Sequence, residues 1–185
     1  MPIVINGSGS VTGITTRLAA ASAPAGSVIQ VVEHELNSAH QTSSGDQWHY
    51  TTLTGAITTQ FDDSKVLVDQ RINVCGGPNS GGYYTLSGKL YRNDAEVTGA
   101  NSTASGSRPD SWWTVGSQDW DNFNRYMVPA SYLDTPGNAG TYTYKVYCRD
   151  YRDNGLININ RYGADADSDT YQVGRSTLTL TEVAG

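Results

Sequence analysis

The stretch from Lys65 to Cys75 alternates between apolar and polar side chains, and this pattern limits the fold more strongly than any other feature of the chain. Successive side chains on a strand point to opposite faces, so a period of two predicts a strand in a sheet with one dry face and one wet face. The apolar set is Val66, Val68, Ile72 and Val74, and the polar set is Lys65, Asp69, Arg71 and Asn73.

The composition also favours strands. The chain holds 20 Gly, 12 Tyr and 4 Trp, but only 2 Phe and 2 Met. Thr, Tyr and Trp favour pleated sheets, whereas Gly and Asn favour turns. Because about eight short strand-like runs are separated by turn-rich spacers, the sequence predicts an all-β, two-sheet sandwich. Besides 65–75, we expect strands at about 28–34, 48–61 with an interruption at Gly55, 84 up to Asn93-Asp94, 112–115, 124–133, 142–151, 156–162 and 171–183.

Residues 1–27 differ in composition from the remainder. Gly7 to Ser10 has the composition of a flexible linker, and Ile14, Leu18 and Ala21 share one face of a short predicted helix. We interpret 1–27 as an anchoring arm that docks onto a neighbour, and 28–185 as the β-sandwich domain. The arm residues predicted to make assembly contacts are Ile3, Val4, Ile5, Ile14 and Leu18.

Charge and hydropathy exclude several partners. The net charge is −6, and the 12 basic residues are scattered rather than clustered. Nucleic acids and anionic membranes are bound through clustered Lys and Arg, so neither is an expected partner. No run approaches the roughly 20 apolar residues that cross a bilayer. The first residues lack the basic start and apolar core of a secretory signal, so we expect synthesis in the cytoplasm.

The two cysteines, Cys75 and Cys148, each end an alternating run. Two buried, inert thiols are the first interpretation, because free Cys behaves as a small hydrophobic residue. A bridge between adjacent strands and a two-ligand metal site are the alternatives.

Metal-binding patterns are incomplete. Asp165 to Asp169 resembles the opening of a calcium loop, but the sixth and twelfth positions are Thr170 and Ser176 instead of Gly and Glu. We predict a solvated acidic loop, with a weak calcium site as the alternative. The spacing of His34, His40 and His49 gives no reason to expect a zinc site. No cofactor or metal is expected.

Catalytic patterns are also missing. No Gly-x-Ser-x-Gly elbow occurs. Asp62-Asp63 has the character of a turn. Asp119 and Asp121 flank Trp120 and could face one sugar subsite, as the acids of glycosidases do, but this spacing is more typical of a surface strand. We predict no catalytic residues.

An aromatic cluster is the best binding candidate. Sugar rings have apolar faces that stack on indole and phenol groups, while their hydroxyls need amide and carboxylate partners. Alternatively, the rings fill the sandwich core or a subunit interface. Two adjacent tryptophans on a strand cannot both point inward, so at least one should lie on a surface. The candidate glycan contacts are Trp112, Trp113, Trp120, Asp121, Asn122 and Tyr126.

Four motifs lie near the two ends of the chain: Pro24 to Val32, Thr143-Tyr144-Lys145-Val146, Asn158-Ile159-Asn160-Arg161 and Ser176 to Ala184. They resemble the motifs of small virion proteins of tailed bacteriophages, especially marine and cyanobacterial ones. The segments that carry this resemblance cover roughly the first 35 and last 45 residues. Tyr147 to Tyr151 departs from the pattern, because it is more polar and aromatic than the usual continuation.

The resemblance implies a jelly-roll-like module, commonly threefold, that is mounted on a particle by its N-terminal arm. It implies no catalytic residues. We therefore expect a homotrimer that contacts other virion proteins through the arm and resides in the virion. The expected function is a short fibre or tail knob that adheres to a bacterial surface glycan. The alternative is a capsid decoration or cement protein without a ligand.

Overall fold

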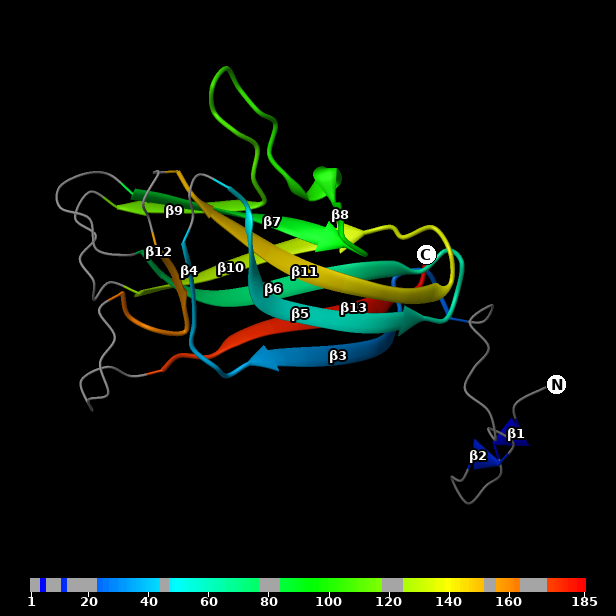
Figure 1. Cartoon of the computed structure of the whole chain (residues 1–185). Coiled ribbons are helices and arrows are strands. Elements are labelled where there is room, and N and C mark those ends of the chain that lie inside the picture. The colour runs from blue at the N-terminus through cyan, green and yellow to red at the C-terminus, as the bar shows by residue number, and fades with distance from the viewer. Residues whose placement is uncertain are drawn as a thin grey trace.

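Two antiparallel β-sheets pack face to face in the protein (Figure 1). The computed structural model describes residues 4–5, 11–12, 23–43, 47–76, 84–117, 125–151, 156–163 and 173–185. Within these residues the regular elements are strands, apart from the 3-10 turn Thr98–Ala100. The prediction of an all-β sandwich is therefore confirmed.

The strand order is that of a jelly roll. One side of the sandwich runs β3-β13-β6-β10, and the other runs β5-β11-β7-β9. Numbering these eight strands along the chain gives 1-8-3-6 and 2-7-4-5, the double-sheet arrangement shared by viral capsid and lectin domains. The strands are Val28–Leu36 (β3), His49–Thr59 (β5), Lys65–Gly76 (β6), Tyr84–Arg92 (β7), Trp113–Ser117 (β9), Arg125–Asp134 (β10), Gly140–Asp150 (β11) and Ser176–Val183 (β13).

Short strands add to both sheets. Strand β12 (Leu156–Ile159) pairs with the end of β6 beyond β13, and β4 (His40–Ser43) pairs with β12, which completes a six-stranded sheet. Strand β8 (Ala95–Glu96) pairs with β7 and completes a five-stranded sheet. Neither β4 nor β8 was expected, because each is too short to show a period.

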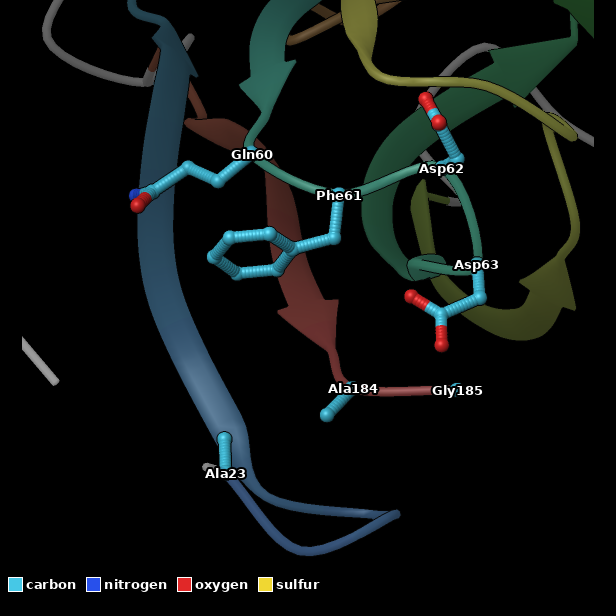
Figure 2. Close-up of a pocket in the computed structure, with 7 residues that line it drawn as sticks. All are labelled: Ala23, Gln60, Phe61, Asp62, Asp63, Ala184 and Gly185. Carbon is cyan, nitrogen blue, oxygen red and sulfur yellow. The ribbon is translucent and has the colours of Figure 1, made fainter. Parts of the chain in front are cut away.

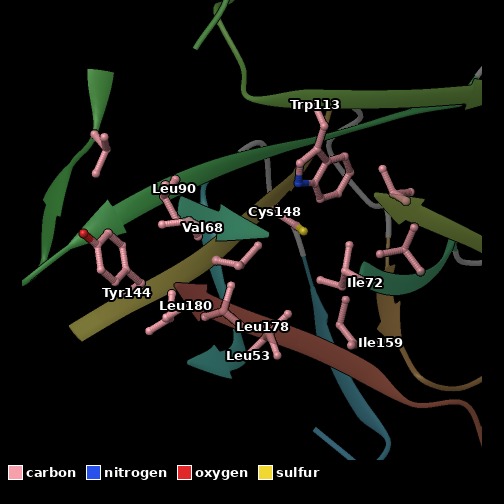
Figure 3. Packing of buried hydrophobic residues seen from close by; sticks show 14 of the residues in the cluster. Leu53, Val68, Ile72, Leu90, Trp113, Tyr144, Cys148, Ile159, Leu178 and Leu180 are labelled. Carbon is pink, nitrogen blue, oxygen red and sulfur yellow. The ribbon is translucent and has the colours of Figure 1, made fainter. Parts of the chain in front are cut away.

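The alternating segment from Lys65 to Cys75 lies in β6, which has one buried face and one exposed face, as predicted. Val66, Val68, Ile72 and Val74 are completely buried. Gln70 also points inward and is buried, whereas Leu67 points outward and is 37% exposed. The inner residues of both sheets form one core, which Figure 3 shows around Val68, Ile72, Leu178 and Leu180.

The open side between β3 and β5 is closed by side chains. His34 Nε2 lies 3.1 Å from the backbone nitrogen of Ala56 and 3.0 Å from its carbonyl oxygen. Gly55 makes this approach possible, because a Cβ there would lie 2.3 Å from the His34 ring. Strand β5 continues through Gly55, so the predicted interruption is wrong: the glycine accommodates a ring from the other sheet.

Two inward carboxylates also connect the sheets. Asp134 on β10 accepts hydrogen bonds from Arg92 Nη1 (2.6 Å) and from the Tyr144 hydroxyl (2.7 Å). Burial and the bond to Asp134 raise the pKa of Tyr144 far above its usual value, so its phenol remains a donor. These contacts join β10 to β7 and β11.

Glu182 on β13 is completely buried. Its carboxylate accepts hydrogen bonds of 2.6 Å from the Gln60 backbone, the Ser64 hydroxyl and the Gln30 amide. The acidic residue of the closing strand therefore fastens the turn between β5 and β6 to the six-stranded sheet.

Within the N-terminal arm, the structure describes residues 23–27 and two short strands, β1 (Val4–Ile5) and β2 (Val11–Thr12), which pair antiparallel. In Figure 1 this pair lies away from the two packed sheets. Ile3, Ile14 and Leu18, with the predicted short helix, lie outside the described residues. The sandwich connects to the arm through Gly26 and Ser27, which exchange backbone hydrogen bonds with Ala184.

Candidate functional site

The predicted glycan segment does not form an exposed platform where it is described. Trp113 is only 6% exposed and packs in the core over Gly88, where a Cβ would lie 2.0 Å from the indole. Trp112 is half-buried and its Nε1 donates to the Ser131 carbonyl on the edge strand β10 (3.4 Å). Tyr126 is half-buried against the core. Trp120, Asp121 and Asn122 lie outside the described residues.

The structure therefore assigns Trp112 and Trp113 to packing. As expected for adjacent residues, only one of the two points fully inward. The other covers the backbone of an edge strand, which is one way in which proteins protect such edges. Trp113 in particular has no surface to offer a ligand.

Cys75 and Cys148 are free, buried thiols, so the first interpretation is the one the structure supports. Burial raises the pKa of Cys148 far above its usual value, which keeps this thiol protonated. His34 is engaged with β5, and His49 Nδ1 lies 3.4 Å from the Thr42 hydroxyl. No three His, Cys, Asp or Glu side chains of the described residues form a metal-binding group. The acidic segment 165–169, with Asp119, lies outside those residues.

A hollow of about 340 Å³ lies at the end of the sandwich near the C-terminus, between the β5–β6 turn and residues 184–185. Asp62 and Asp63 line it, and they form part of a turn as expected. Figure 2 shows that their carboxylates point in different directions. Asp62 Oδ1 accepts a hydrogen bond from the Ala139 backbone nitrogen (2.9 Å), which connects the β5–β6 turn to the loop before β11.

An aromatic row crosses the outer face of the five-stranded sheet. The centroid of the Tyr147 ring lies 5.7 Å from that of Tyr50 and 4.2 Å from that of Tyr91. The register brings them together, because Tyr147 pairs with Tyr50 on β5 and is the diagonal neighbour of Tyr91 on β7. All three side chains are half-buried, so part of each ring is open to solvent.

Cations lie over the ring of Tyr50 and over that of Trp48, which precedes β5. Lys89 Nζ is 5.1 Å and Arg149 Cζ is 6.0 Å from the centroid of the Trp48 ring. Lys145 Nζ lies 5.7 Å from the Tyr50 ring. All three distances are within the range at which a cation is attracted to an aromatic face. We call this surface the aromatic face; it consists of Trp48, Tyr50, Lys89, Tyr91, Lys145, Tyr147 and Arg149.

A bulge in β5 lies beside the aromatic row. The pairing of β5 with β11 shifts between Lys145 and Tyr147, and Thr52 has a φ of 66°. This is a strained conformation for a β-branched residue. The Thr51 hydroxyl holds the bulge by donating to the Val146 carbonyl (2.8 Å). Bulges often change the direction of side chains next to functional sites, and this one immediately follows Tyr50.

Lys89 is fixed by two carboxylates. Its Nζ lies 2.7 Å from Glu96 and 3.1 Å from Asp110, and Asn101 donates to both acids. Burial by itself would lower the pKa of Lys89, but the hydrogen bonds to the two acids outweigh it and raise this pKa. The bond from Lys89 lowers the pKa of Asp110. The cluster thus stays charged at neutral pH and ties the 101–110 loop to β7.

The chain matches no known protein-family model, and no curated protein sequence matches it. Among the described residues, no helix is long and apolar enough to span a membrane. Half-buried aromatic rings, with cations, carboxylates and amides beside them, can stack a sugar ring and bind its hydroxyls.

The aromatic face was not predicted from the sequence, although the sequence contains two features that indicate it. Positions 145, 147 and 149 share one parity on β11, and they lie within or beside the segment that departs from the virion-protein pattern. Trp48 and Tyr50 are a second, distant aromatic pair. Only the pairing of β5, β11 and β7 shows that these segments form one surface.

Proposed function

We propose that this chain is a non-enzymatic structural protein of a bacteriophage virion, displayed on the particle as a short fibre or tail knob. Its aromatic face adheres to a glycan on the bacterial surface. The arm, residues 1–27, mounts it on other virion proteins, and the sandwich associates with copies of itself as a homotrimer. The virion and trimer parts rest on the resemblance of the two ends of the chain.

The observation that carries adhesion is the aromatic row with Trp48 beside it. A stretch of β7 from Thr85 to Tyr91 covers about 20 Å at the usual rise of a strand, which is enough for a chain of several sugars. The jelly roll is compatible with this function, because lectin domains use it, but a fold by itself does not imply a function.

The test is a glycan array, supported by binding to bacterial cells, with the full chain. Trp48→Ala and Tyr91→Ala should each lose most of the binding, because each removes a stacking surface from the aromatic face. Met127→Ala is the matched control, since Met127 is 51% exposed on the opposite sheet. The proposal fails if the wild type binds no glycan, or if all three variants bind equally well.

The alternative function, a capsid decoration protein, is favoured by the outer face of the six-stranded sheet. Leu67 pairs with Leu133 on one side and Thr181 on the other, and Thr181 pairs with Val31. The three apolar members of this row are 37%, 46% and 59% exposed, in the order Leu67, Leu133 and Val31. Such a row is suited to a contact between subunits.

The charges beside this row indicate what would cover it. Glu33 and Asp69 lie on the same face as Arg71 and Arg175, and the four line a shallow hollow of about 470 Å³. A face that carries both signs is complementary to a second copy of itself. Light scattering of the wild type and of Leu67→Asp tests this: the wild type should be an oligomer and the variant a monomer. A monomeric wild type contradicts it.

A further inference from the structure

A groove adjoins the aromatic face at the far end of β7. It has a volume of about 550 Å³, within the usual range for small-ligand sites. The sheet contributes Thr85, Ser87 and Thr114 to it, and the loop that follows β8 contributes Arg108 and further serines. Most of the lining residues are Ser or Thr, so the groove presents many hydroxyl groups. We call it the serine groove.

The loop side of the groove is held in place. The Ser102 nitrogen donates to the Ser111 carbonyl (2.8 Å), and Ser105 and Arg108 exchange backbone hydrogen bonds of 3.2 and 3.1 Å. Gly106 permits this tight turn with a φ of 61°. With Lys89 and Asn101 holding Asp110, the loop presents Arg108 from a hydrogen-bonded hairpin. Such a site loses little entropy when it binds a ligand.

The serine groove and the aromatic face are continuous. Ser87 in the groove pairs directly with Arg149 on β11. Arg149 Cζ lies 5.7 Å from the ring of Tyr151, which lines the groove, and 6.0 Å from the ring of Trp48. A chain of sugars lying along the aromatic face would therefore place one unit in the groove.

Charge distinguishes this end of the surface. Lys89 and Lys145 are paired with carboxylates. Arg108 is exposed and makes no ion pair with any described residue. Its nearest acidic neighbour in the loop, Asp110, is occupied by Lys89 and Asn101. A guanidinium is suited to planar or multidentate anions, which it binds through two parallel hydrogen bonds.

We infer that the serine groove selects a sugar unit with an anionic substituent, which Arg108 binds while the Ser and Thr hydroxyls bind the sugar hydroxyls. This inference rests on the proposed glycan adhesion. The net charge of −6 makes general attraction to polyanions unfavourable, so any binding of an acidic chain must come from such a local site.

The test compares three polymers: hyaluronan with carboxylates, dextran sulfate with sulfate esters, and uncharged dextran. Binding of the full chain is measured by interferometry at physiological salt. The wild type should bind at least one acidic polymer more tightly than dextran, and the better of the two identifies the anionic group. Arg108→Ala should weaken that binding by about tenfold or more, as for loss of a charged hydrogen bond, and Arg108→Lys should weaken it less.

Lys65→Ala is the matched control, because it also removes one positive charge but lies on the opposite sheet. If the Arg108 and Lys65 variants behave alike, or if dextran binds as well as the acidic polymers, the inference is overturned while adhesion stands, provided that Trp48→Ala still reduces binding. If the wild type binds none of the polymers and no glycan on the array, both proposals fail.

Discussion

The two sheets differ in the side on which Asp134, Glu182 and Lys89 lie. The six-stranded sheet turns Asp134 and Glu182 inward, where they bind groups of the other sheet or of the turn that leaves it. The five-stranded sheet turns Lys89 outward, together with Lys145 and Arg149. The inward carboxylates bind groups across the sandwich and so help to fix the packing of the two sheets. The outward cations lie on the surface, where they can bind a ligand without changing that packing.

The outer faces of the two sheets also differ in the kind of contact to which they are suited. The outer face of the six-stranded sheet presents threonines, an apolar row and exposed ions, which is suited to a contact with another subunit. The aromatic face presents closely packed, tilted rings and a fixed charge cluster, which is suited to a ligand. If the comparison is right, substitutions should affect stability, binding or association according to the sheet and the side on which they lie.

The largest effect is expected from Asp134→Ala. It leaves the Arg92 guanidinium and the Tyr144 hydroxyl without their acceptor inside the sandwich, and should lower the free energy of unfolding by about 3–5 kcal/mol. Urea denaturation measures it. Asp69→Ala, on the outer side of the same sheet, is the control and should change stability by no more than about 0.5 kcal/mol. Equal effects would contradict the division between inner and outer charges.

Glu182→Ala should follow, with a loss of about 2–3 kcal/mol, because it leaves buried donors from Gln60, Ser64 and Gln30 unsatisfied. Glu182→Gln keeps one acceptor oxygen and should lose less. Hydrogen exchange at the backbone of Gln60 reports the contact directly. Unchanged protection there in Glu182→Ala would show that the carboxylate does not hold the turn.

Lys89→Met should cost less than either change, about 1–2 kcal/mol, because Glu96 and Asp110 are partly open to solvent and water screens the loss. Glycan binding should fall as well, since the loop and Trp48 both depend on this lysine. Lys145→Met is the matched control: its partner Asp94 is exposed, and no measurable loss of stability is expected. A destabilised Lys145→Met would show that exposure does not decide these effects.

The contribution of Lys89 should also depend on pH. Because the pKa of Asp110 is lowered in the folded state, the stability that its carboxylate contributes is fully present above the ordinary aspartate pKa of about 4. This stability is lost as the pH falls through the lower folded pKa. Because the pKa of Lys89 is raised in the folded state, the stability that its ammonium group contributes is lost only as the pH rises through the folded pKa, which lies above about 10.5. The stability difference between wild type and Lys89→Met should therefore be constant between these limits. A difference that disappears near pH 7 would contradict it.

The smallest effect is expected from Val31→Thr on the outer face of the six-stranded sheet. Val31 is 59% exposed, and threonine suits a strand equally well, so unfolding should change by no more than about 0.5 kcal/mol. Self-association, measured by light scattering, should weaken nevertheless. If both stability and association stay unchanged, this face does not carry the contact between subunits.

Much of the fold could be predicted from the sequence because its strands alternate. The eight long strands were all expected, and the most regular one, β6, matched within one residue. Boundaries failed where no period exists: β13 begins only at Ser176, and β4 and β8 are too short to register. At Gly55 a local rule failed, because the glycine serves the approach of His34 instead of a break in the strand.

The candidate site was harder to predict. A ligand contact at Trp113 is wrong because this side chain is buried, while Trp120, Asp121 and Asn122 lie outside the described residues. Density of aromatic residues pointed to Trp112 and Trp113, yet neighbouring positions on a strand face opposite ways and these two serve the core and an edge. The aromatic face instead combines Trp48, Tyr91 and Tyr147, which are far apart in the chain. No linear window contains that set.

The sequence alone determines the face of the strand on which each side chain lies, because a period of two assigns every side chain to one of two faces. Which strands become neighbours, and in what register, was decided only by tertiary packing. Loops of different lengths permit many pairings, and the one that buries the apolar sides of all strands together also places Tyr50, Tyr147 and Tyr91 in a row. The protein's surface chemistry is thus a consequence of how its interior is packed.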